Sequence, residues 1–348
     1  MKKTILMTSL LASVLLVNCG PKMNDNTKSS SADGVSIEDV DPMPYANSIT
    51  AEELKEMLYV YASDEFEGRN TGEPGQKKAV AYLKEFYENQ DIAAALDSTY
   101  FQTVPESFFR AGSGIKASEN VVAYIKGSTK PEEYIIISAH LDHVGMSDDG
   151  EVYNGADDDG SGTVGLLEIA EAFNDAVKAG HAPQRSVVFL HVTGEEKGLY
   201  GSRYYAENPI FPLANTVADL NIDMIGRVDD AHKDNENYIY LIGSDKLSTE
   251  LDSISTAVNE KYMNIDLDYT YNDDKDPNRF YYRSDHYNFA KNGVPIIFYF
   301  NGVHADYHKV SDTPDKINYP MLQKRTQLVF LTAWELANRA DRIVVDKK

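Results

Sequence analysis

Short apolar runs alternate with helical patterns along most of this chain. Residues 134–137 and 187–190 are continuous apolar runs of the kind found in buried strands. Between them, residues 162–179 carry apolar positions at helical spacing, which predicts a strand–helix–strand crossover and hence a parallel sheet. The apolar positions of this helix are Val164, Leu167, Ala170 and Phe173.

Further strands are predicted at residues 120–125, 217–225 and 294–300. Polar residues follow the apolar part of these strands, and ligands of open α/β sheets bind at that edge. We therefore expect an α/β fold in a single domain, with a mostly parallel mixed β-sheet flanked by helices on both faces.

Two helices are predicted ahead of the first strand. Thr50 and Glu53 have the spacing of a capping box. The apolar positions after them are Leu54, Met57 and Leu58. A second helix is predicted at residues 75–89, after Pro74, which suits a helix entry. We expect both helices to cover the sheet.

The first residues of the chain indicate export. Lys2 and Lys3 precede an apolar run at residues 5–17, which is too short to span a bilayer and fits a signal peptide. The run ends at Asn18 and Cys19, which resembles the lipobox of bacterial lipoproteins, although Asn18 departs from the small residue usual before the cysteine. An ordinary secreted protein with an incidental cysteine is the alternative.

These observations predict three parts. Residues 1–18 form a signal peptide, residues 19–42 a lipidated Cys19 with a disordered tether, and residues 43–348 the folded domain. The tether is predicted because its polar composition leaves too little apolar surface to fold. The lipid would attach the protein to a membrane of the bacterial cell envelope, on its periplasmic or surface side.

The charge of the chain narrows its partners. Its 348 residues carry a formal net charge of -22, which disfavours phosphate-rich partners, so we predict no nucleic-acid binding. Hydrophobic residues make up 42%, enough for one large core.

The first candidate segment for chemistry holds His140, Asp142 and His143, just after a predicted buried strand. An imidazole there can bind a metal ion through one nitrogen, while a carboxylate two residues on holds its other N–H. Taken alone, this segment is more typical of a hydrogen-bonded polar loop.

The second segment is the acidic run of Asp157, Asp158 and Asp159 before the helix at 162–179. Three successive carboxylates repel one another unless a cation offsets them. A calcium loop is the alternative, but an EF-hand loop has acidic groups at alternate positions and a closing Glu. A phosphate cradle is disfavoured by the same acidic run.

Two more segments add carboxylates. Glu195 and Glu196 follow a buried strand, where adjacent side chains point apart, so one can bind a metal ion while the other faces its water. Asp223 lies in an otherwise apolar stretch, where a charge must be paired or metal-bound.

The last segment places Tyr307 and His308 after the strand at 294–300, with His304 close by as a competing candidate ligand. The candidate ligands combine imidazoles with carboxylates, a mixture that suits zinc, and a neighbouring Glu can act as the base. The set therefore predicts a two-zinc hydrolase site.

Together these motifs resemble those of the zinc aminopeptidases of peptidase family M28, over residues 65–317. The resemblance implies a zinc-dependent exopeptidase-like fold, two Zn²⁺ ions per chain, and peptide substrates cleaved after their N-terminal residue. The implied ligands are His140 and Asp223 for one ion, Glu196 and His308 for the other, and Asp158 as the bridge. Asp158 is chosen over Asp157 because the bridging carboxylate of the family is the fourth residue of a G-x-x-D pattern, which begins here at Gly155.

The resemblance also assigns supporting roles. Glu195 would be the general base, Tyr307 would donate a hydrogen bond to the oxyanion, and Asp142 would orient His140. His286 has either a substrate-pocket or a structural role. Two further motifs resemble family signatures, one formed by Glu67, Gly68 and Arg69, the other by Ser284, Asp285 and His286.

Other functions on the same scaffold stay open. A carboxypeptidase or dipeptidase needs a basic residue for the substrate carboxylate, for which Arg283 and Arg227 are candidates. A glutaminyl-cyclase-like transferase uses one zinc, so the presence of both His140 and His308 argues against it. A non-catalytic binding module loses metal ligands, which this chain keeps.

Overall fold

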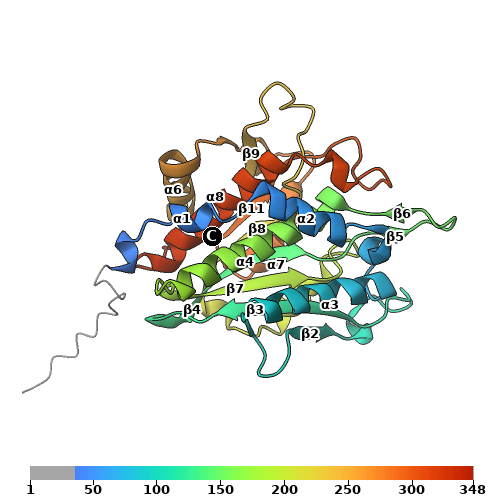
Figure 1. The fold of residues 1–348 in the computed structure, drawn as a ribbon, viewed down its shortest axis with the longest axis horizontal. Coiled ribbons are helices and arrows are strands. Elements are labelled where there is room, and N and C mark those ends of the chain that lie inside the picture. Colours follow the sequence, from blue (N-terminus) through green and yellow to red (C-terminus); the bar gives the residue numbers. More distant parts are fainter. Residues whose placement is uncertain (1–35, 348) are drawn as a thin grey trace, which may run out of the picture.

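A mixed sheet of nine strands forms the centre of the molecule in the computed structural model, which describes residues 36–347 (Figure 1). The strand order is β1-β3-β7-β4-β8-β11-β9-β10, and β2 pairs with β3. Its strands are β1 (Ala93–Ala94), β2 (Phe101–Val104), β3 (Ser118–Ile125), β4 (Lys130–His140), β7 (Arg185–Val192), β8 (Thr216–Ile222), β9 (Tyr238–Ile242), β10 (Asp266–Asp268) and β11 (Ile296–Phe300). A separate hairpin joins β5 (Gly145–Met146) to β6 (Val152–Tyr153).

The middle of the sheet is parallel. Strands β7, β4, β8 and β11 run in one direction, while β3 is antiparallel to β7 and β9 is antiparallel to β11. The predicted crossover is confirmed, because β4 and β7 are parallel neighbours joined through α4 (Gly162–Lys178). The carboxyl ends of the four parallel strands therefore meet at one edge of the sheet.

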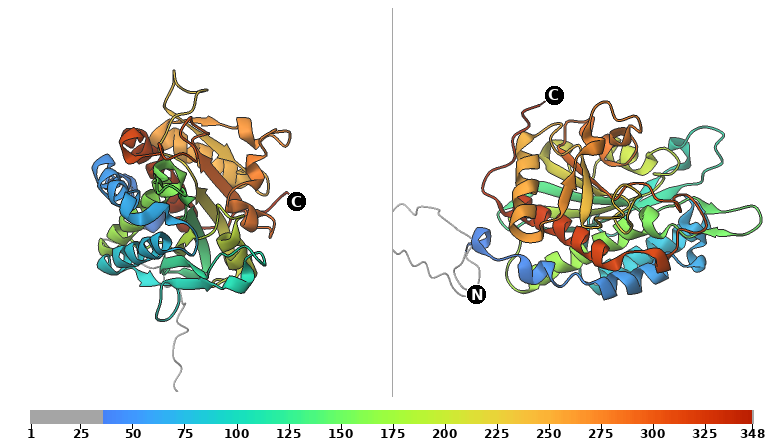
Figure 2. Two further views of the ribbon diagram at one scale, coloured as in Figure 1. Left: turned by 90° about the vertical axis from the view of Figure 1, so that its right-hand side faces the viewer. Right: turned by 90° about the horizontal axis from the view of Figure 1, so that it is seen from above.

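Helices cover both faces of the sheet, as the sequence predicts (Figure 2). One face is covered by α2 (Ala51–Tyr61), α3 (Pro74–Asn89), α4 and α8 (Tyr319–Asn338), and the other by α5 (Tyr200–Glu207) and α7 (His286–Ala290). Of the other α-helices, α1 (Met43–Ala46) packs against α4 and α6 (Thr249–Val258) packs against α8. None of the helices within residues 36–347 combines the length and the hydropathy needed to span a bilayer.

The core has a layer on each side of the sheet because strand side chains alternate between its faces. In β4, Ile135 and Ile137 join the cluster under α2, α4 and α8, whereas Ile136 joins the cluster that contains Tyr205 of α5 and Phe289 of α7. This two-sided burial explains why the parallel strands are continuous apolar runs.

The two predicted helix starts are confirmed. Thr50 is the N-cap of α2, and its Oγ1 accepts a 3.2 Å hydrogen bond from the backbone N–H of Glu53. The Glu53 carboxylate accepts from the Thr50 hydroxyl at 2.6 Å, while the Thr50 N–H donates to Glu168. Pro74 is the first residue of α3.

The predicted tether is wrong for its last residues. Ile37 is buried in the core cluster of the sheet face under α4, and Gln184 donates a 3.0 Å hydrogen bond to the Glu38 carboxylate. Val40 also packs against this cluster, so the domain starts before Met43. The signal peptide and Cys19 lie outside the described residues.

Glu168 of α4 makes stability depend on pH. Its side chain is 4% exposed, and burial, followed by the charges of Glu53 and Glu171, raises its pKa to about 8. The folded protein thus keeps a proton that the unfolded chain releases near the ordinary glutamate pKa of 4.5. This contribution is full below the unfolded pKa and is lost as pH rises through about 8.

We therefore expect Glu168→Gln to raise the melting temperature at about pH 9 and to change it little at about pH 5, because the amide never has to lose a proton. Thermal melts monitored by circular dichroism measure both. The exposed Glu52→Gln of α2 is the control. An equal effect of Glu168→Gln at the two pH values would contradict the prediction.

Candidate metal centre

The predicted ligands come together at the carboxyl edge of the parallel strands. His140 is the last residue of β4, Glu196 lies in the loop after β7, and Asp223 directly follows β8. Asp158 belongs to the irregular segment Ala156–Ser161 that leads into α4, and His308 lies in the loop after β11. Residues far apart in the sequence thus meet because parallel strands end at the same edge.

Asp158 lies between two groups of side chains whose nitrogen and oxygen atoms could bind metal ions; these are called the two donor groups. Its Oδ1 is 3.2 Å from Nε2 of His140, and its Oδ2 is 3.0 Å from Nε2 of His308. His140 Nε2 is also 3.5 Å from Oδ1 of Asp223, and His308 Nε2 is 3.1 Å from Oε2 of Glu196. One carboxylate therefore contacts both groups, as the predicted bridge requires.

These donors fit a pair of zinc ions. Nε2 of His140, Oδ2 of Asp158 and Oε1 of Glu196 are buried without a hydrogen-bond partner among the described residues, although other donor atoms lie close. Atoms that share a tetrahedral zinc ion at about 2.0–2.1 Å lie about 3.3 Å apart, close to the separations found here. Imidazole and carboxylate donors left unpaired at this spacing are what a zinc ion completes.

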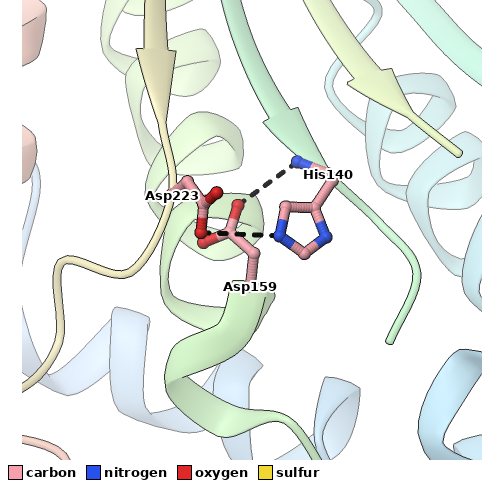
Figure 3. A group of neighbouring side chains, drawn as sticks. All are labelled: His140, Asp159 and Asp223. Carbon is pink, nitrogen blue, oxygen red and sulfur yellow. Dashed lines mark hydrogen bonds and ion pairs between the residues drawn. The ribbon is translucent and has the colours of Figure 1, made fainter. Parts of the chain in front are cut away.

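Asp159 lies in the donor group of His140 and Asp223, but its carboxylate already accepts hydrogen bonds from the protein (Figure 3). Its carboxylate accepts hydrogen bonds from the backbone N–H groups of His140 at 3.2 Å, Gly162 at 3.0 Å and Met224 at 3.0 Å. These bonds hold β4, α4 and the end of β8 together. We assign Asp159 to the support of the site.

Asp157 and His304, the competing candidates, pair with each other. Nε2 of His304 lies 3.1 Å from Oδ2 of Asp157, whose Oδ1 accepts from the backbone N–H of Gly226 at 2.7 Å. The three carboxylates of the acidic run therefore point in different directions, and among them Asp158 contacts both His140 and His308.

Asp142 contacts His140 differently from the prediction. The main-chain carbonyl of Asp142 lies 3.0 Å from Nδ1 of His140, whereas its carboxylate oxygen is 4.0 Å away. The carboxylate accepts instead from the Thr71 hydroxyl at 2.7 Å and from the backbone N–H of Glu195 at 3.1 Å. Asp142 therefore links the His140 loop to the loop that carries Glu195.

Glu195 and Tyr307 line a cavity together with Asp158 and Asp223. Burial, and then the charges of Glu196 and Asp223 against that of His140, holds the pKa of Glu195 well above its ordinary value. Burial and the nearby carboxylates also raise the pKa of Tyr307, so its hydroxyl keeps its proton. The rest of the lining is mostly apolar and comprises Met224, Phe280, Phe298, Phe300 and Val303, with Arg283 as its cation.

The two further sequence motifs contribute buried residues that do not line the cavity. Arg69 is fully buried and donates to the carbonyl oxygens of Leu141, Asn154 and Gly155, so it ties the His140 loop to the Asp158 loop. His286 is buried against Phe298, with Nε2 2.8 Å from the carbonyl oxygen of Tyr281, which gives it a structural role.

Ser284 and Asp312 position metal-site residues, a role that the sequence did not reveal. The Ser284 hydroxyl donates a 2.6 Å hydrogen bond to Oδ2 of Asp223. The Asp312 carboxylate accepts from the backbone N–H groups of Asp157 at 3.0 Å and Asp158 at 3.2 Å. Their sequence signals were weak: Ser284 lies in a motif that resembles a family signature, and Asp312 lies in the polar segment that follows His308.

The comparison with protein families decides the identity of the chain. The family described as Peptidase family M28 matches residues 120–333, which contain every predicted ligand. This chain belongs to peptidase family M28. Its α/β fold is the fold that the family resemblance implied.

Curated relatives cover the chain in part. A probable aminopeptidase of Saccharomyces cerevisiae is 27% identical over 225 residues, which cover 63% of this chain and 57% of the yeast protein. Leupeptin-inactivating enzyme 1 of Streptomyces exfoliatus is 28% identical over 260 residues, covering 74% of this chain and 50% of that enzyme. The chain thus spans about half the length of these relatives.

Solved structures share the fold. LapB of Legionella pneumophila aligns with a TM-score of 0.68 and 21% identity, covering 87% of this chain and 76% of that chain. BSAP, a zinc aminopeptidase of Bacillus subtilis, aligns with a TM-score of 0.65 and 16% identity, covering 86% and 99%. A glutaminyl cyclase of Bacteroides thetaiotaomicron also aligns, with a TM-score of 0.61 and 16% identity, covering 82% and 98%. The fold alone therefore does not select the reaction.

Because Asp158 contacts both donor groups and Asp223 only one, replacing each should change the number of bound metal ions differently. We expect Asp158→Asn to lose both metal ions, because the side chain contacts both donor groups, and Asp223→Asn to lose one. The loss of affinity is expected to exceed the ~10–100-fold typical of removing a residue that only supports a ligand. Elemental analysis after dialysis measures the ions per chain, with the exposed Asp97→Asn as control. Retention of two ions by Asp158→Asn would exclude the bridging position.

Proposed function

We propose that this protein is an exported two-zinc aminopeptidase that hydrolyses N-terminal residues from peptides. The observation that carries the proposal is Asp158, whose two oxygens face two separate donor groups beside a cavity lined by a carboxylate and a phenol. Bound zinc ions would polarise the scissile carbonyl and lower the pKa of a water molecule. His140, Asp223, Glu196 and His308 would hold the ions, with Asp158 between them.

Glu195 is the proposed general base. It lines the cavity with Asp158 and Asp223, and its backbone N–H is held by Asp142, which fixes the loop. Its pKa is raised, and the positive charge of bound ions would offset the neighbouring carboxylates, so a carboxylate able to take and return a proton is available. It takes a proton from the attacking water and delivers it to the leaving amine.

Tyr307 is the proposed donor to the oxyanion. Its ring stacks on the ring of His308 with 3.9 Å between centroids, which fixes its position at the cavity. Because its pKa is raised, the phenol stays protonated and can donate a hydrogen bond as negative charge develops on the carbonyl oxygen.

The cavity favours an exopeptidase with an apolar preference. Aromatic side chains form much of its wall, and Met224 and Val303 add further apolar surface, so the lining suits a large apolar side chain. A free α-amino group would meet the acidic side chains of Asp158, Glu195 and Asp223. A substrate with a large apolar N-terminal residue therefore matches both the charge and the lining.

A dipeptidase or carboxypeptidase is the second candidate, favoured by Arg283. Arg283 lines the cavity and contacts the Phe280 ring at 4.9 Å, and within residues 36–347 no acidic oxygen lies within ion-pair distance of its guanidinium. Arg227, the other candidate, is held by Asp306 at 2.8 Å and by Asp312 at 3.8 Å. Of these two arginines, Arg283 is the one placed to bind a substrate carboxylate.

Export and lipid attachment at Cys19 are part of the proposal and rest on the sequence of the first residues alone. Mass spectrometry of the mature protein would test them. A mature chain that begins at Cys19 with a covalent lipid is expected, and a chain without lipid would contradict the anchor.

The experiment that tests the proposed function compares substrates of the purified domain. We expect two zinc ions per chain and cleavage of leucine and phenylalanine anilides, but no cleavage of their N-acetylated forms. Leucyl dipeptides and their C-terminal amides separate the second candidate, because a dipeptidase would prefer the free carboxylate and lose that preference in Arg283→Met. Cleavage of N-acetylated anilides would contradict an aminopeptidase, and one zinc with cyclisation of N-terminal glutamine would favour a transferase.

Glu195→Gln tests the assigned base. We expect this variant to keep two zinc ions and its melting temperature but to lose at least ~10²-fold in kcat, because the amide cannot accept a proton. Elemental analysis and steady-state kinetics on leucine anilide measure both, with the neighbouring surface variant Lys197→Gln as control. Undiminished turnover by Glu195→Gln would exclude it as the base.

A further inference from the structure

His143 is a buried imidazole that no role above accounts for. It lies in the loop that follows His140, its side chain is fully buried, and neither Nδ1 nor Nε2 has a hydrogen-bond partner among the described residues. Burying a polar group without a hydrogen-bond partner destabilises a folded protein, so such a group requires an explanation.

The ring of His143 faces the second donor group. Its Nδ1 lies 2.9 Å from Oε1 of Glu196 and 3.8 Å from Oδ2 of Asp158. The shorter separation is that of a hydrogen bond, yet neither Nδ1 nor Oε1 is aligned for one. Nitrogen and oxygen atoms this close and misaligned fit donors whose lone pairs are directed at a shared cation.

Neighbouring main chain holds the imidazole in this place. The backbone N–H of His143 bonds to the carbonyl oxygen of Arg69, and Asn70 forms a parallel bridge with His143. Gly155 has φ +55°, and a Cβ there would lie 2.5 Å from ring atoms of His143. The loop that carries Asp158 thus leaves room for this ring only because residue 155 is glycine.

We propose that His143 is a further ligand of the second metal position, together with Asp158, Glu196 and His308. This inference rests on the two-zinc centre of the proposed function. The second position then has two imidazoles, whereas the first has only His140. Because imidazole nitrogen is a better zinc donor than another carboxylate oxygen would be in so acidic a site, the second ion is held more tightly.

Zinc-dependent stabilisation separates a ligand from a merely structural histidine. We expect His143→Asn to lower the increase in melting temperature that zinc produces, while the metal-free melting temperature changes much less. One of the two ions should leave at ~10–100-fold lower chelator concentration than in the unchanged protein. His191→Asn is the matched control, since His191 is equally buried but bonded to Tyr87 at 2.8 Å.

X-ray absorption at the zinc edge tests the same inference without a variant. Three imidazoles shared by two ions give an average of ~1.5 per zinc, whereas His140 and His308 alone give ~1.0. An average near 1.0, or a His143→Asn variant with unchanged zinc stabilisation and chelator midpoints, would overturn the inference. Absence of zinc binding in the unchanged protein would instead remove the proposed function, so the two failures are distinguishable.

Discussion

Compensation of buried negative charge is the constraint on which the site depends. Several carboxylates meet at one edge of the sheet, and an ionised carboxylate is costly to bury without a partner. Asp142, Asp157 and Asp159 are compensated by the protein itself, through N–H and hydroxyl donors. Asp158 and Glu196 each keep a buried oxygen that no hydrogen bond from residues 36–347 satisfies. The chain thus separates the acids that build the loops from those that face a cation.

Buried cations stabilise these loops through the main chain rather than through ion pairs. Arg69 donates to carbonyl oxygens on both sides of the site, and Arg325 of α8 does the same for the carbonyl oxygens of Ile225, Arg227 and Tyr238. An arginine bonded to neutral carbonyls keeps its charge, so it holds a loop in place and offsets the field of nearby carboxylates. Hydrogen bonds from these two arginines therefore help to position the loops after β4 and β8.

The sequence predicted those strands and helices whose pattern of apolar residues matches their burial in the fold. The apolar runs of β4 and β7 and the periodic helix between them are buried where the pattern requires. The helix α8 was missed, because it is buried on several sides and its apolar stripe is interrupted by Arg325 and Gln327, which the core accepts only through long-range contacts. The same reason limits the site: the G-x-x-D pattern of the resembled family selected Asp158 as a candidate, but the orientation of His143 depends on Gly155 and Arg69, which no local pattern reports.

The segment around Ile37 has a consequence for the direction in which the site opens. Glu38 bonds to Gln184, which directly precedes β7, so this segment lies at the edge of the sheet where the parallel strands begin, opposite to the metal centre (Figure 1). In the proposed lipid-anchored protein, a domain held from that side would present its cavity outward, toward approaching peptides, with the body of the domain between the metal centre and the membrane.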